Sequence, residues 1–73
     1  MNQAWVYILE RNDRGLTIGF TTSLKRLQEI KDQGLNLIYV KRFPDVLSAL
    51  AQKALFARLG RDATLRLINH TKP

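Results

Sequence analysis

The hydrophobic pattern of the first twenty residues predicts a β-hairpin. Residues 4–9, Ala-Trp-Val-Tyr-Ile-Leu, are rich in aromatic and β-branched side chains, which favour a strand. Residues 12–15, Asn-Asp-Arg-Gly, are typical of a tight turn, because Asn, Asp and Gly tolerate the positive φ that such turns need. Residues 16–20 then form the returning strand.

A helix follows the hairpin. Leu24, Leu27 and Ile30 recur at the spacing of one helical face. The hydroxyls of residues 21–23, Thr-Thr-Ser, can accept hydrogen bonds from the free backbone N–H groups at the start of this helix. Gly34 is well placed to end it.

The second half of the chain predicts one more strand and two more helices. Residues 35–43 are strongly apolar and suit a third strand that is covered on both faces. Asp45 is the expected cap of a long helix that Gly60 ends, and Asp62 is the expected cap of a last helix. The apolar stripe of the long helix is expected at Val46, Leu47, Leu50, Ala54 and Leu55.

The order of elements is therefore strand-strand-helix-strand-helix-helix. No repeat, linker or low-complexity segment interrupts it, so residues 1–73 form a single domain, with a core over about 4–68 and a short C-terminal tail. The packing solution is an α/β (α+β) domain in which three helices lie against a three-stranded sheet.

The charge of the chain favours a polyanionic partner. Twelve Lys and Arg residues against six Asp and Glu residues give a formal net charge of +6. Contacts of Lys and Arg with phosphates release condensed counterions, so nucleic acid or another polyanion is the expected partner.

Other classes of protein are excluded or disfavoured by composition. The chain has no cysteine, which excludes disulfides, cysteine-based metal sites and thiol chemistry. No apolar run approaches the ~18 residues of a membrane span, and the N-terminus lacks the charged-then-apolar order of a signal peptide. A cytoplasmic protein with no membrane partner is expected. His70, the only histidine, has no neighbouring carboxylate cluster and is not expected to bind metal.

Short segments in a fixed order carry a resemblance to a known family. They are Val6-Tyr7-Ile8, Ile18-Gly19, Thr21-Thr22-Ser23-Leu24, Leu37-Ile38-Tyr39-Val40, and Phe43-Pro44-Asp45 leading into Ser48-Ala49-Leu50. Together they resemble the GIY-YIG endonuclease superfamily, with the closest likeness to its small stand-alone members. The resemblance implies a three-stranded antiparallel sheet flanked by helices, which agrees with the hydrophobic pattern.

The resemblance also implies where a catalytic site would lie. Active members of the superfamily use two tyrosines, an arginine, often a histidine, and a glutamate that binds one divalent metal. The first tyrosine corresponds to Tyr7 and the second falls at Thr17. The arginine maps to Arg26 if one residue is missing, or to Leu27 without a gap, and the glutamate aligns with Lys53.

Lys53 is the sharpest departure from the family pattern. A hard cation such as Mg²⁺ needs anionic oxygen, and an ammonium group at the ligand position repels it. The two glutamates, Glu10 and Glu29, lie outside the second long helix, and Asp45 is about two turns from Lys53. No metal or cofactor is therefore expected. Tyr7 and Arg26 are vestigial catalytic candidates, and the favoured alternative for Tyr7 is an ordinary strand aromatic whose ring packs.

Several basic residues are candidates for contact with phosphate. We call the following set the phosphate candidates: Lys25, Arg26, Lys41, Arg42, Lys53 and Arg58. Arg26 is the best of them, because a guanidinium grips a phosphate with paired N–H donors, although a solvated helix face is the alternative. Lys53 would replace a metal site with a direct cation–phosphate contact, and Arg61 could extend the basic surface.

Three hypotheses of function follow. The first is a GIY-YIG-like domain that binds nucleic acid, with DNA as the expected partner, through phosphates and without hydrolysis. The second is an active DNA endonuclease with a reorganised site, in which Tyr7 and Arg26 act with a divalent metal such as Mg²⁺. The third is a module that binds a protein partner or forms a homodimer, in which the apolar third strand pairs along its edge.

Overall fold

The computed structural model describes the backbone of residues 3–71. Strands β1 (Ala4–Glu10) and β2 (Leu16–Thr21) form the hairpin, and β3 (Asn36–Phe43) pairs with the other edge of β1. Both pairings are antiparallel, so the sheet has the order β2-β1-β3. Helix α1 (Leu24–Asp32) joins β2 to β3, and helix α2 (Val46–Thr71) follows the sheet. The predicted α+β architecture with a three-stranded antiparallel sheet is confirmed.

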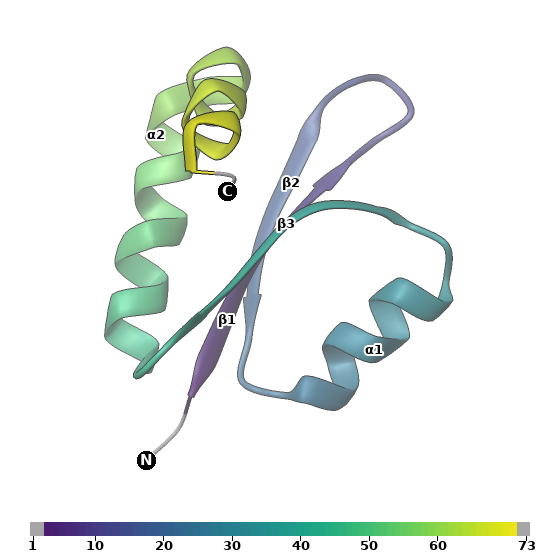
Figure 1. Cartoon of the computed structure of the whole chain (residues 1–73), viewed down its shortest axis with the longest axis vertical. Coiled ribbons are helices and arrows are strands. Elements are labelled where there is room, and N and C mark those ends of the chain that lie inside the picture. Colours follow the sequence, from purple (N-terminus) through teal and green to yellow (C-terminus); the bar gives the residue numbers. More distant parts are fainter. Residues whose placement is uncertain (1–2, 72–73) are drawn as a thin grey trace.

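The two helices lie on opposite faces of the sheet (Figure 1). Side chains alternate between the faces of a strand, so the residues of β1 divide into two sets. Ala4, Val6 and Ile8 are fully buried on the face that α2 covers. Trp5 and Tyr7 point to the other face, where α1 lies.

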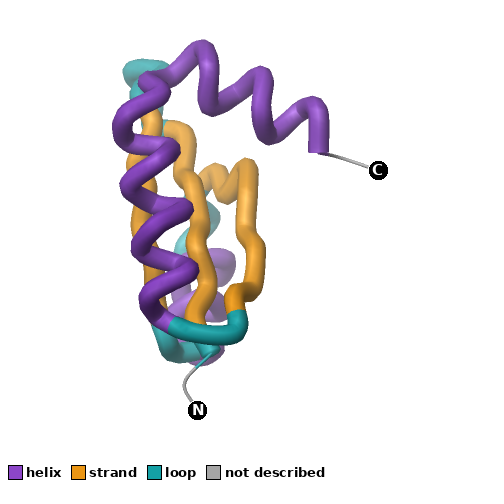
Figure 2. The backbone as a smooth tube through the Cα atoms, turned by 90° about the vertical axis from the view of Figure 1, so that its left-hand side faces the viewer, coloured by secondary structure: helices purple, strands orange, loops and turns teal. Residues whose placement is uncertain are grey.

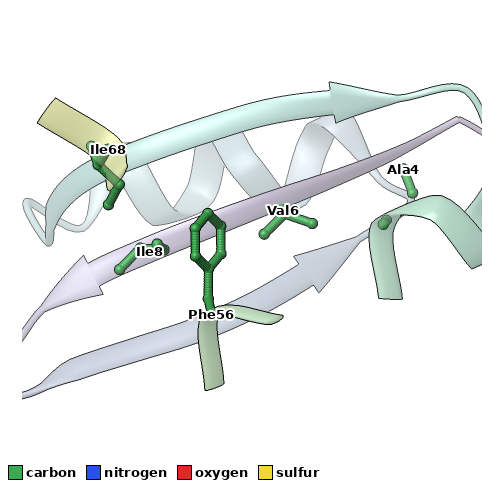
Figure 3. Close-up of a cluster of buried hydrophobic side chains, with 6 residues drawn as sticks. Ala4, Val6, Ile8, Phe56 and Ile68 are labelled. Carbon is green, nitrogen blue, oxygen red and sulfur yellow. The ribbon is translucent and has the colours of Figure 1, made fainter. Parts of the chain in front are cut away.

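The core lies between the sheet and α2, as Figure 3 shows. Val6 and Ile8 of the central strand pack with Phe56, which is 2% exposed, and with Ile68, which comes from the far end of α2. The ring of Tyr39 in β3 meets the ring of Phe56 edge to face, with centroids 5.2 Å apart. Both ends of α2 therefore hold the same sheet face.

The number of helices differs from the prediction, which placed three helices after or between the strands. Residues 3–71, which the structure describes, contain two, because residues 46–71 form one element, α2, which bends sharply at Gly60 (Figure 2). Gly60 has φ 81° and ψ 177°, a conformation that favours glycine. Helical structure resumes directly after this single residue, so no loop separates a third helix. The helical turns also continue to Thr71, beyond the expected end of the core.

Two side chains hold the bend in place. The buried hydroxyl of Thr64 donates a hydrogen bond to the carbonyl of Phe56, 3.2 Å away, across the bend. The guanidinium of Arg61 donates to the carbonyl of Arg14 in the hairpin turn and lies 3.5 Å from the carboxylate of Glu10. These contacts fix the second segment of α2 to the first segment and to the hairpin.

The predicted apolar stripe of α2 was largely wrong. Of its members, Val46 is half-buried, whereas Leu47, Leu50, Ala54 and Leu55 are exposed. The core side of α2 is instead made by Ala49 and Phe56, and Leu47 is 80% exposed. Apolar residues occur nearly all round this helix, so their spacing alone does not select one face.

Two other expectations of burial also need correction. The third strand was expected to be covered on both faces, but Val40 is 42% exposed because β3 is an edge strand opposite a short helix. In α1, Leu27 and Ile30 are buried as predicted, whereas Leu24 is 65% exposed. The predicted cap is confirmed, since the Ser23 hydroxyl accepts from the backbone N–H of Arg26 at 3.3 Å.

The assignment of the core can be tested with a matched pair of substitutions. Ile8→Val removes one buried methyl group and should lower the free energy of unfolding by about 0.5–1.5 kcal/mol. Leu47→Ala removes more atoms from an exposed site and should change it by less than about 0.5 kcal/mol. Urea denaturation, followed by Trp5 fluorescence and circular dichroism, gives both values. An equal or larger loss for Leu47→Ala would show that α2 packs through a different face.

Candidate nucleic-acid interface

Tyr7 lies over Gly19 in the centre of the hairpin. The two residues pair in the register of β1 and β2, and a Cβ atom added to Gly19 would lie 2.5 Å from Cζ and Oη of Tyr7. The aromatic ring therefore occupies the space that any side chain at position 19 would need. This glycine therefore permits the close approach of the Tyr7 ring to the backbone of β2.

Thr17 lies on the same face of the sheet as Tyr7. It pairs with Leu9, two residues along β1 from Tyr7, and its side chain is exposed. Its hydroxyl accepts a hydrogen bond from the guanidinium of Arg11 at 3.3 Å. The position that the resemblance assigns to a second tyrosine thus holds a small hydroxyl group that is already bonded to a neighbouring cation.

Lys53 is separated from Tyr7 by the sheet. Its Nζ lies 5.8 Å from the ring centroid of Phe20, which pairs with the buried Val6 on the face covered by α2. Arg26 is exposed in the first turn of α1, on the side of Tyr7. The structure therefore keeps three of the aligned positions on one side and places Lys53 on the other.

The aligned residues do not fit a divalent metal. Tyr7, Thr17, Arg26 and Lys53 offer a phenol, a hydroxyl, a guanidinium and an ammonium group, without one carboxylate. Over the residues that the structure describes, no group of three or more His, Cys, Asp or Glu side chains could hold a metal ion. Mg²⁺ takes carboxylate and phosphate oxygens, so these residues are unsuited to bind it.

The ion pairs gather at the end of the sheet near the hairpin turn. Arg61 contacts the carboxylates of Glu10 at 3.5 Å and Asp62 at 3.4 Å, and Arg11 contacts Asp13 at 3.3 Å. The backbone N–H of Gly15 and then the Arg11 guanidinium lower the pKa of the Asp13 carboxyl group. Arg61 is thus engaged in structural contacts. The expectation that it extends a basic surface was wrong.

None of the phosphate candidates takes part in these ion pairs, and the structure divides them into two groups. The α1-side cations, on α1 or on the sheet face beneath it, are Lys25, Arg26 and Arg42. The α2-side cations, on α2 or on the sheet face beneath it, are Lys41, Lys53 and Arg58. Arg42 pairs with Trp5, which fixes its side, and Lys41 pairs with Val6 and lies 5.5 Å from the Phe43 ring. The six phosphate candidates are therefore divided between the two sides of the sheet.

Comparison with models of protein families and with curated protein sequences finds no match. Among solved structures, the chain is similar to a UPF0213 protein from Bacillus halodurans, determined in solution by NMR. The TM-score is 0.71 at 22% sequence identity, over 94% of this chain and 85% of that chain. The chain shares the fold of that protein. This likeness concerns the fold alone, and it agrees with the fold that the ordered segments implied. Within the described residues of this fold, neither helix is long and apolar enough to cross a membrane.

The contact of Tyr7 with Gly19 generates a prediction. Gly19→Ala should force the ring out of its position and lower the free energy of unfolding by about 1–3 kcal/mol. Chemical denaturation of Gly19→Ala, Tyr7→Ala and the double variant measures the coupling. The combined loss should be smaller than the sum of the single losses by about 0.5–3 kcal/mol, because Tyr7→Ala removes the clash. Additive losses would show that the ring lies elsewhere.

Proposed function

We propose that this domain binds nucleic acid through its phosphates and does not hydrolyse it, with DNA as the expected partner. The observation that carries the proposal is the distribution of charge. Three of the six carboxylates are paired with Arg11 and Arg61 near the hairpin turn, whereas the phosphate candidates have no carboxylate partner in the described structure. Unpaired guanidinium and ammonium groups remain free to replace counterions on a polyanion.

The loss of hydrolysis is supported by the chemistry at two positions. Metal-assisted phosphodiester cleavage requires a cation held by anionic oxygen beside the scissile phosphate. The aligned position holds Lys53, whose ammonium group lies against the ring of Phe20 on the opposite side of the sheet from Tyr7. Thr17 lacks the second phenol. Tyr7 therefore remains without the partners that would make it catalytic.

The α1 side is the better candidate for the contact surface. Arg26 and Lys25 are exposed in the first turn of α1, and Arg42 is exposed beside Trp5 on the same side. On the other side, Lys41 and Lys53 lie against aromatic rings, which partly satisfies their charge. Two guanidinium groups on the α1 side also offer paired donors that match phosphate oxygens.

The test compares two triple variants with the same change in charge. The α1-side variant carries Lys25→Gln, Arg26→Gln and Arg42→Gln, and the α2-side variant carries Lys41→Gln, Lys53→Gln and Arg58→Gln. Fluorescence anisotropy with labelled duplex and single-stranded DNA, over a series of salt concentrations, gives the affinity and its salt slope. The wild type should bind less tightly as salt rises, and the α1-side variant should lose about 2–3 from the slope, at about 0.9 for each phosphate contact. The α2-side variant should lose less.

Other outcomes would contradict parts of this proposal. Equal losses in both variants would point to diffuse charge rather than to the α1 side. Salt-insensitive binding, or no binding at low salt, would overturn nucleic-acid binding altogether. The recovered DNA should stay intact on a gel in Mg²⁺ or Mn²⁺, and metal-dependent cuts that disappear in Tyr7→Phe would establish the nuclease alternative instead.

A further inference from the structure

An exposed apolar surface follows the bend of α2. Leu55 and Leu59 before the bend are 40% and 39% exposed, and Leu67 after it is 36% exposed. They line two pockets that share Leu67, one of about 250 Å³ that also includes Tyr39 and Phe56, and one of about 350 Å³ that also includes Ala63. We call the continuous surface formed by Leu55, Leu59, Ala63 and Leu67 the α2 groove.

The core does not explain why these leucines are present. The core is formed by Val6, Ile8 and Phe56 with their neighbours, and the groove residues lie outside it. Leaving leucines half-covered forgoes part of the ~1.5–3 kcal/mol that full burial of each side chain contributes. Contiguous apolar surface with a polar margin is typical of protein interaction sites.

The margin of the α2 groove is positively charged. Lys41 lines the first pocket and Arg66 lines the second, whereas neither pocket is lined by a carboxylate. Arg58 lies three residues after Leu55 on α2, a spacing that makes the two neighbours on the helix surface. None of the three cations has an ion pair in the described structure, and the nearby Asp62 is bonded to Arg61. Charge complementarity therefore calls for an acidic occupant.

The same charges disfavour a second copy of this chain as the occupant. In a two-fold symmetric dimer the same patch meets itself, so the cationic margins of the two grooves would face each other. Each copy also carries a net charge of +6. Like charges juxtaposed across an interface are unfavourable, whereas an acidic partner is attracted by all of them.

We propose that the α2 groove docks an amphipathic helix of another protein, with leucine-like residues on one face and Asp or Glu residues along its flanks. Anchors at positions i, i+3, i+4 and i+7 of such a helix would contact Leu55, Leu59 and Leu67. Its carboxylates would pair with Lys41, Arg58 and Arg66. This surface is separate from the α1-side cations proposed to contact nucleic acid.

The probe for this proposal is a set of labelled synthetic helices, each about 18 residues or five turns long. The first has leucine at the four repeating anchor positions and glutamate on the flanks. The second replaces each glutamate with lysine, and the third replaces each leucine with glutamine and keeps the negative charge. Anisotropy titrations with the full chain should show binding of the first peptide only.

Substitutions in the protein identify the surface. Leu67→Gln should weaken binding of the leucine–glutamate peptide by about tenfold or more, because Leu67 is shared by both pockets and lies at the centre of the proposed interface. Arg66→Glu should also weaken it, because it reverses a charge at the margin. Leu47→Gln is the matched control, since this leucine is 80% exposed on the same helix outside the groove, and should leave the affinity unchanged. Circular dichroism and Trp5 fluorescence verify that each variant is folded.

Several results would overturn the proposal. If the glutamine-substituted peptide binds as tightly as the first peptide, net charge alone explains the binding and the leucine contacts are not needed. If the first peptide does not bind, the α2 groove is not a docking site for an acidic helix. A concentration-dependent dimer in sedimentation, lost in Leu67→Gln, would make a second copy the occupant. Full displacement of the peptide by DNA, with no effect of Leu67→Gln, would assign the cations to nucleic acid alone. Failure to bind DNA, with the peptide results as expected, would leave this proposal intact and overturn only the proposed function.

Discussion

The packing of β1 against α2 is the contact on which the rest of this structure depends. A chain of 73 residues buries only about 60% of the surface of its unfolded state, so its stability depends on one small core. Val6 and Ile8 at the centre of that core are fully buried, and a slip of one residue would turn them to the other face. The register that buries them also fixes Tyr7 over Gly19. The geometry of the candidate interface is thus a consequence of the core on the other side of the sheet.

The bend at Gly60 is the second constraint, and it links stability with the outer surface. A straight α2 would carry its last turns past the sheet, whereas the bend returns Ile68 to the core. Thr64 and Arg61 hold the two segments at a fixed angle. That same angle places Leu67 near both Leu55 and Leu59, so the α2 groove exists because the core needs the bend.

Much of the fold could be predicted from local patterns, because local chemistry decides it. The hairpin turn forms at the expected residues, although Arg14, with φ 68°, takes the positive φ that was expected of Asn, Asp or Gly. The Asp45 carboxylate accepts from the backbone N–H of Ser48 at 2.7 Å, as a helix cap should. The side of α2 that faces the sheet could not be predicted, since apolar residues such as Leu47 and Phe56 occur on several sides of it. Tertiary packing made that choice.

For the candidate site, the sequence predicts which residues occupy the aligned positions, but it does not predict on which side of the sheet each residue lies. Alignment along the chain assigned Thr17 and Lys53 to family positions, but alignment carries no information on which side of a sheet a helix lies. It also did not reveal that Arg61 is bound by Glu10, a contact between residues far apart in sequence. No local signal separates an arginine that is committed to such a pair from one that is free to meet a phosphate.

The α1-side cations and the cationic margin of the α2 groove lie on opposite sides of one sheet, so a partner bound at one surface changes the electrostatic potential at the other. An acidic helix bound in the α2 groove would lower the positive potential that attracts DNA to the α1 side. The smallest principal extent of the molecule is 23 Å. The electrostatic potential of an exposed charge is screened over about 8 Å at physiological ionic strength and over about 30 Å at 0.01 M. The two partners would therefore oppose each other more strongly in dilute buffer than in physiological salt, because a longer screening length lets the charges of one surface act on the other.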